Sequence, residues 1–265
     1  MSAVERPTPR QRTRRLVVLA AAVFAVVVPV VQNLGGFGLS QAEFAADGDR
    51  TLQVAGYAFS IWGLIYLGLL AYAVRQVLPQ TGESVLINRM GWPSAVAMFG
   101  IGMWIVAAAL NLKAASVVII FASLLALLVP LLVNAGTIRA TGVADRDRWF
   151  LIWPLAALAG WLTIAAPLNL ITTATALDAL PAFVSPTGWA IIAIAVVVLV
   201  AIEVTLYLRT LFYALPIAWG LVGAFVAEQE RNPMLGFTAL GAAFLLVVAA
   251  VILVFGLKRG IERRR

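Results

Sequence analysis

Three aromatic residues recur at helical spacing in one apolar stretch of the sequence, residues 56–74. Phe59, Trp62 and Tyr66 stand at i, i+3 and i+7, so a helix over this stretch places them one above another on a single face. Such a face can line a site for a hydrophobic molecule, or it can serve only for packing and interfacial anchoring. The stretch by itself leaves both interpretations open.

A second pattern lies in the sequence WPLAALAGWLTIAAPLN. Trp161, Ala165, Leu168 and Asn169 stand at i, i+4, i+7 and i+8, again on one helical face. An Asn inside an apolar helix needs a partner, so we expect it to face the protein interior or a polar pocket. A hydrogen bond to another helix, worth about 1 kcal/mol or less, and a contact with a ligand are equal alternatives.

Glu203 is the only carboxylate that lies inside a predicted helix. It stands near the cytoplasmic end of that helix, one turn before Tyr207, so its side chain can reach water by snorkelling. The sharper hypothesis is that Glu203 couples transport to proton movement. The position of Glu203 near the helix end favours snorkelling.

The absence of Cys and His from all 265 residues excludes several kinds of chemistry. Disulfides, thiol nucleophiles, Cys/His zinc sites, histidine-ligated haem and Ser-His-Asp catalysis all require one of these residues. We therefore predict no catalytic residues and no metal site. The net charge of +7 arises from basic residues at helix ends and termini, which indicates orientation in a membrane and not binding of nucleic acid.

The elements that carry these residues are predicted to be membrane-spanning helices. The chain is 63% hydrophobic and 12% charged and contains repeated apolar runs of about 20 residues, the length that crosses a bilayer. This composition predicts an all-α, polytopic membrane protein with eight transmembrane helices. We expect the helices at about residues 16–33, 54–78, 92–112, 115–136, 149–174, 187–208, 211–228 and 234–257.

The distribution of basic residues predicts that both termini lie in the cytoplasm. With this orientation, all but three of the 19 Lys and Arg residues fall on the cytoplasmic side, and only Arg50, Lys113 and Arg231 lie outside. The composition is consistent with a bacterial plasma (inner) membrane. We divide the chain into a disordered basic leader, a five-helix core, three additional helices and a basic tail, at residues 1–15, 16–175, 176–257 and 258–265.

The stretch FSIWGLIY in the second predicted helix and the pattern W-x-x-x-A-x-x-L-N in the fifth resemble the TspO/translocator-protein family, also called tryptophan-rich sensory proteins. The resemblance covers about residues 15–175, and the last three helices look like the C-terminal extension of longer bacterial members. It implies a five-helix bundle whose pocket, between the second and fifth helices, binds tetrapyrroles and other hydrophobic molecules.

The resemblance also implies which side chains line that pocket. Phe59, Trp62 and Tyr66 match the family's aromatics in the second helix, and Trp161, Ala165, Leu168 and Asn169 match its pocket in the fifth. In the third helix the family's L-N-x-x-W aligns best with Trp104, although Ile101 then replaces the Asn. The other register matches Leu110 and Asn111 but loses the Trp.

The sequence departs from the family pattern before the second helix. Smaller members carry a W-x-P-P segment there, whereas residues 34–58 contain neither Trp nor Pro, which weakens the case for porphyrin photochemistry that depends on that Trp. Without His, metal-free porphyrin stacked on aromatic side chains is an easier ligand than haem. We expect no required cofactor, with a tetrapyrrole as a candidate ligand.

These features predict a membrane sensor or carrier that binds a tetrapyrrole, lipid or isoprenoid. The alternative is a small secondary transporter of a hydrophobic or organic metabolite, for which Glu203 is the main support and the lack of a clear four-plus-four repeat counts against it. An enzyme has few residues to work with beyond its tryptophans. The expected partners are the bilayer and a hydrophobic small molecule, and the small-residue face of Gly56, Ser60 and Gly63 allows a homodimer.

Overall fold

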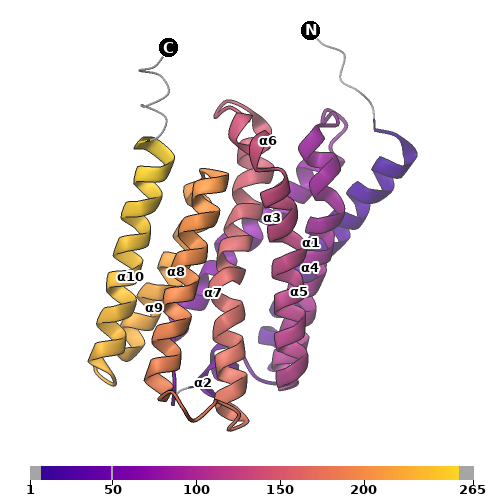
Figure 1. Ribbon diagram of the computed structural model, residues 1–265. Coiled ribbons are helices and arrows are strands. Elements are labelled where there is room, and N and C mark those ends of the chain that lie inside the picture. Colours follow the sequence, from indigo (N-terminus) through magenta and orange to yellow (C-terminus); the bar gives the residue numbers. More distant parts are fainter. Residues whose placement is uncertain (1–6, 49, 257–265) are drawn as a thin grey trace.

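The computed structural model describes residues 7–48 and 50–256 and, within them, contains helices and turns but no strands (Figure 1). Eight helical segments in this part are long and apolar enough to cross a membrane. Their lengths of 18 to 29 residues correspond to about 27 Å or more at 1.5 Å per residue, close to the thickness of the hydrocarbon core. The prediction of an all-α protein with eight spans is confirmed.

The eight spans follow one another with few interruptions. In chain order they are α1 (Pro9–Gly35), η1 (Gly56–Ser60) with α3 (Ile61–Val77), α4 (Val85–Ala109), α5 (Lys113–Val133), η2 (Arg148–Ile152) with α7 (Trp153–Ala176), α8 (Pro186–Leu208), α9 (Leu211–Glu228), and α10 (Pro233–Val251) with η3 (Ile252–Gly256). Two short helices, α2 (Gln41–Ala46) and α6 (Ala135–Ala140), lie in the connections.

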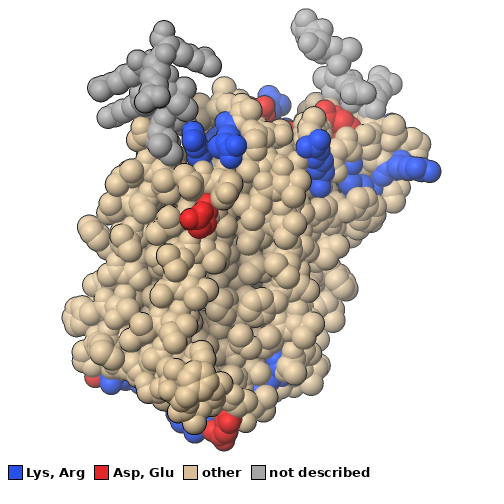
Figure 2. All heavy atoms as spheres, viewed as in Figure 1, with Lys and Arg blue, Asp and Glu red and all other residues tan. Residues whose placement is uncertain are grey.

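The spans stand side by side in one bundle, with α7 the most buried of them (Figure 1). Helix α7 packs against α3 and α5 on one side and against α8 and α9 on the other. The start of α1 and the end of η3 lie at the same end of the bundle, and α2 lies across the opposite end. Basic side chains gather near these two ends, while the band between them is almost entirely uncharged on the face shown in Figure 2.

The first helix corrects the prediction of a disordered leader. Helix α1 begins at Pro9, well before residue 16, because Thr8 and Gln11 form a capping box and Pro9 suits the first helical position. Arg14 and Arg15 are therefore helical and buried, and both donate hydrogen bonds to the carboxylate of Glu83. Residues 1–6 of the predicted leader and the basic tail 258–265 lie outside the described residues.

Two further differences from the predicted helices arise from residues that cap a helix start. Helix α4 begins at Val85 and not near residue 92, because the side chain of Ser84 accepts a hydrogen bond from the backbone N–H of Ile87 and so caps the helix. Helix α2 forms inside the region expected to be a polar loop, where Ser40 and Glu43 make a second capping box. Both corrections follow from local capping, which is independent of hydropathy.

Candidate functional site

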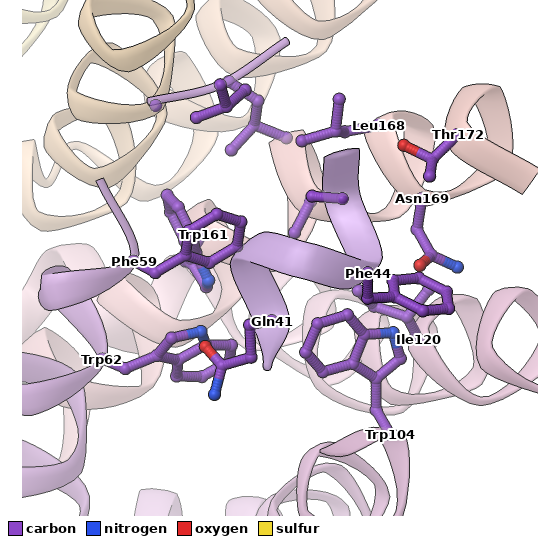
Figure 3. Close-up of a pocket in the computed structure, with 15 residues that line it drawn as sticks. Gln41, Phe44, Phe59, Trp62, Trp104, Ile120, Trp161, Leu168, Asn169 and Thr172 are labelled. Atoms are coloured by element: carbon purple, nitrogen blue, oxygen red, sulfur yellow. The ribbon is translucent and has the colours of Figure 1, made fainter. Parts of the chain in front are cut away.

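A cavity between α3, α4, α7 and α2 brings together most of the predicted binding residues (Figure 3). Seven of the eight line it: Phe59, Trp62, Trp104, Trp161, Ala165, Leu168 and Asn169. Because α3 and α7 pack directly against each other, their predicted faces meet in the interior. Trp104 of α4 joins them, while Leu110 and Asn111, the alternative register, are exposed at the turn that follows α4.

Trp161 of α7 lies at the centre of the aromatic contacts in this cavity. The ring of Trp161 meets Phe59 and Trp62 edge to face, with ring centroids 6.4 and 6.0 Å apart. This geometry is favourable for aromatic pairs. Tyr66, the eighth predicted residue, stacks on Trp62 at 5.2 Å but lies outside this cavity. It lines an adjoining surface hollow beside α1, which shares Phe59 and Trp62 with the cavity.

The outer cover of the cavity is α2, which sequence reasoning missed. Its Phe44 is only 1% exposed and meets Trp104 edge to face at 6.2 Å (Figure 3). The segment that lacks the W-x-P-P motif thus still inserts an aromatic ring into the site. The sequence signal that could have predicted α2 was the capping box formed by Ser40 and Glu43. Hydrogen bonding by the backbone N–H and the hydroxyl of Ser40 also lowers the pKa of Glu43 below its ordinary value.

Polar contacts fasten the residues around α2 to the helix ends beneath them. The backbone N–H of Leu39 donates to the carbonyl of Ala109 at 3.1 Å, and Lys113 forms an ion pair with Asp47. On the other side of α2, three contacts link residues 50–53 to Thr175, Asp178 and Glu228. These are the hydroxyl contact between Thr51 and Thr175 at 2.7 Å, the Arg50–Asp178 ion pair at 3.0 Å, and the bond from the Gln53 N–H to Glu228 at 2.6 Å.

Helix α9 completes the wall of the cavity, although it lies outside the predicted five-helix core. Gly220 lines the cavity, and a Cβ atom at this position would lie 3.4 Å from the ring of Trp161 and 2.9 Å from Ile164. The absence of a side chain therefore lets α9 approach α7 closely. Sequence reasoning gave no sign that this glycine faces the site, since several glycines occur in apolar helices of the chain.

The fifteen lining residues include no charged side chain. Asn169 is satisfied by Ser116 of α5, to which its amide donates at 3.0 Å, so the interhelical bond expected as one alternative is present. In contrast, the indole N–H groups of Trp62, Trp104 and Trp161 are buried and have no hydrogen-bond partner among the described residues. Three unpaired donors around an uncharged cavity suit a hydrophobic molecule that carries acceptor atoms.

The comparison with family models decides what kind of protein this is. The model of the TSPO-like protein family matches residues 15–252. The chain belongs to the TSPO-like family. The match continues beyond residue 175 through α8, α9 and α10, so the last three helices lie inside the matched region. Neither the curated proteins nor the solved structures provide a match to the chain.

The site of this TSPO-like protein is small. Its cavity volume is about 40 Å³, which has room for about three water molecules. Sites for small molecules are typically about 300–1,000 Å³. A ligand of that size can enter only if the surrounding side chains and the segments that carry them move apart.

Glu203 does not belong to the site of this TSPO-like protein. Its side chain is exposed on α8, and it lines none of the cavities described for the molecule. Among the described residues there is also no cluster of three or more acidic side chains that could hold a metal ion. The aromatic cavity is therefore the feature on which a functional proposal can be built.

Proposed function

We propose that this TSPO-like protein is a membrane sensor or carrier that binds a hydrophobic small molecule, either a tetrapyrrole or a lipid or isoprenoid, in the aromatic cavity between α3 and α7. The observation that carries the proposal is the trio of buried indole N–H groups without partners, on Trp62, Trp104 and Trp161, around a cavity with no charged lining residue. Leaving polar groups unpaired costs folding free energy, which a bound acceptor would recover.

The chemistry of the lining limits how such a ligand can lie. A flat conjugated ring can stack on Trp62 or Trp161, whose own edge-to-face contacts would open to admit it. Carbonyl or ring acceptors of the ligand would take the indole hydrogens. Carboxylates find no cation in the cavity, so an anionic ligand would keep them toward the outer end, where Lys113 and Arg50 flank α2.

We also propose the bacterial inner membrane as the location and the cytoplasm as the side of both termini. Support comes from the excess of basic residues at the end of the bundle where α1 begins and η3 ends. The site then lies toward the opposite, outer face of the membrane, because α2 covers that end (Figure 1).

The test is a titration of the purified protein with protoporphyrin IX, followed by tryptophan fluorescence and corrected for inner-filter effects and for partition into empty micelles. Replacing Trp62 or Trp161 by Phe removes an indole donor and part of the stacking surface, so each change should weaken binding by about five- to tenfold. Trp189→Phe is the matched control, because Trp189 is at the surface and bonds the carbonyl of Pro181.

Equal affinities for Trp62→Phe, Trp161→Phe and Trp189→Phe would remove the cavity as the binding site. Saturable binding that is weakened only by the first two changes would support it. If protoporphyrin IX shows no saturable binding, the same comparison with a lipid or isoprenoid distinguishes a different ligand from the absence of a site.

A further inference from the structure

A large groove runs along the outside of the bundle, on the membrane-spanning surface. Its volume is about 960 Å³, and its lining is almost entirely apolar. It is formed by the sides of α3, α7, α9 and α10, with Leu64, Trp153, Leu215 and Phe244 among its lining residues. Because all four helices are spans, the groove opens toward the hydrocarbon of the bilayer.

The groove and the inner cavity are lined by neighbouring residues of the same two segments. Along η1 and the start of α3, Phe59 and Trp62 face the cavity, while Ser60 and Ile61 face the groove. On α9, Gly220 faces the cavity and its neighbour Trp219 faces the groove. The seam between η1 and α9 therefore separates the bilayer from the proposed binding site.

The seam is held by contacts that centre on Trp219. Its indole N–H donates to the carbonyl of Ala58 at 2.8 Å, and its ring meets Tyr57 edge to face at 5.6 Å. The backbone N–H of Ala55 donates to the carbonyl of Gly223 at 3.0 Å. Residues 56–60 form a 3-10 helix at the start of this span, a conformation whose hydrogen bonds are poorer than those of an α-helix.

The route under α2 is also held by polar contacts. An ion pair of Lys113, an ion pair of Arg50 and the hydroxyl contact of Thr51 all fasten that segment, and it faces water. A ligand suited to an uncharged, aromatic cavity partitions into the bilayer, and the groove lies on the bilayer side of the η1–α9 seam. The cavity of about 40 Å³ must also expand before it can hold such a ligand.

We propose that the groove between α3, α7, α9 and α10 is the entrance by which a hydrophobic ligand passes from the bilayer to the inner cavity, and that the η1–α9 seam is its gate, with Trp219 as the closing residue. This inference rests on the proposed function. It also assigns a role to the C-terminal helices, because α9 supplies one side of the gate and α10 one side of the entrance.

An engineered disulfide can lock the gate. Because the chain has no native Cys, two introduced Cys residues can pair only with each other within one chain. A Cβ atom built at Gly223 lies 2.7 Å from the Cβ of Ala58, so a modest separation brings an Ala58→Cys, Gly223→Cys pair into the range of a disulfide. The rate of protoporphyrin IX loading is measured in proteoliposomes by tryptophan quenching. The oxidised protein should load at least about tenfold more slowly than the same protein after reduction, because the gate can no longer open.

A second variant loosens the gate and does not depend on forming the disulfide. Trp219→Phe removes the bond to Ala58 but keeps a ring in the groove, so loading and release should both accelerate by about fivefold with little change in their ratio. Trp189→Phe is again the control, because it also loses an indole bond to a backbone carbonyl, that of Pro181, at a site outside the groove.

The outcomes separate the two proposals. Slow loading in the oxidised protein, or fast loading and release in Trp219→Phe relative to Trp189→Phe, supports the lateral entrance. Saturable binding with rates that neither the disulfide nor Trp219→Phe alters overturns the entrance and leaves the binding site in place. A lack of saturable binding of both protoporphyrin IX and the lipid or isoprenoid probe in the wild-type protein refutes the proposed function and the entrance together.

Discussion

Glu83→Gln should strongly destabilise the protein, because Glu83 is the counter-charge of two buried arginines. Its carboxylate accepts hydrogen bonds from the Nη2 of Arg14 at 3.0 and 3.1 Å and from the Nε of Arg15 at 2.9 Å. All three side chains are about 5% exposed, so water cannot replace the lost charge. The substitution preserves size and removes only the charge.

The expected loss is about 3 kcal/mol, the lower part of the range for breaking a buried ion pair. The lower part applies because Arg15 keeps its bonds to the carbonyls of Gln76, Thr81 and Gly82. For a chain of this length a loss of that size lowers the melting temperature by about 10 °C. The contacts join α1 to the connection between α3 and α4, so their loss also frees the start of α1.

Thermal melting in detergent, followed by intrinsic tryptophan fluorescence, measures the effect. Asp178→Asn is the matched control, because its partner Arg50 is 64% exposed and Asp178 is 80% exposed, and an exposed pair contributes about 0.5 kcal/mol or less. Equal melting temperatures for the two variants would refute the reasoning. Protoporphyrin IX binding below the melting temperature should be unchanged in Glu83→Gln, because Glu83 does not line the cavity.

Two further predictions concern orientation and the site. If both termini are cytoplasmic, a membrane-impermeant thiol reagent applied to intact cells should label an Asp178→Cys variant and not a Gly142→Cys variant; the reverse pattern would invert the proposed topology. Asn169→Ala and Ser116→Ala should each lower the free energy of unfolding by about 1 kcal/mol, because the 3.0 Å hydrogen bond between these residues joins α7 to α5. A double-mutant cycle should show that the two effects are coupled, and independent effects would mean that the bond does not contribute to stability.

Spacing placed the aromatic residues on shared helical faces, and the family resemblance implied that those faces form a pocket. Phe59 and Trp62 share a helical face, as do Trp161 and Asn169, and a helix in lipid turns its large aromatic and polar side chains toward other helices when they have partners there. Tyr66 shows where this reasoning stops. It lies on the same face as Trp62 but one turn further from the cavity, where its ring packs on Trp62 and borders a different hollow.

Local capping was informative but was outweighed by hydropathy in the prediction. The start of α1 at Pro9 and the whole of α2 depend on hydrogen bonds between residues three apart, at Thr8 with Gln11 and at Ser40 with Glu43. A scale of hydrophobicity assigns Arg14 to a solvated leader, because such a scale contains no information about Glu83, which lies beside Arg14 only in the folded protein. The charge is compatible with a buried helix only through that contact.

The sequence by itself determined that the chain is an all-helical membrane protein with eight spans, because backbone groups in hydrocarbon must be satisfied within each segment and about 20 apolar residues are needed to cross it. Only the tertiary structure decided that Phe44 covers the site and that Gly220 of α9 completes its wall. Those contacts join residues far apart in the sequence, such as Phe44 with Trp104 and Gly220 with Trp161, and they depend on which helices pack together. Periodicity gives each helix a face, but it does not say which other face it meets.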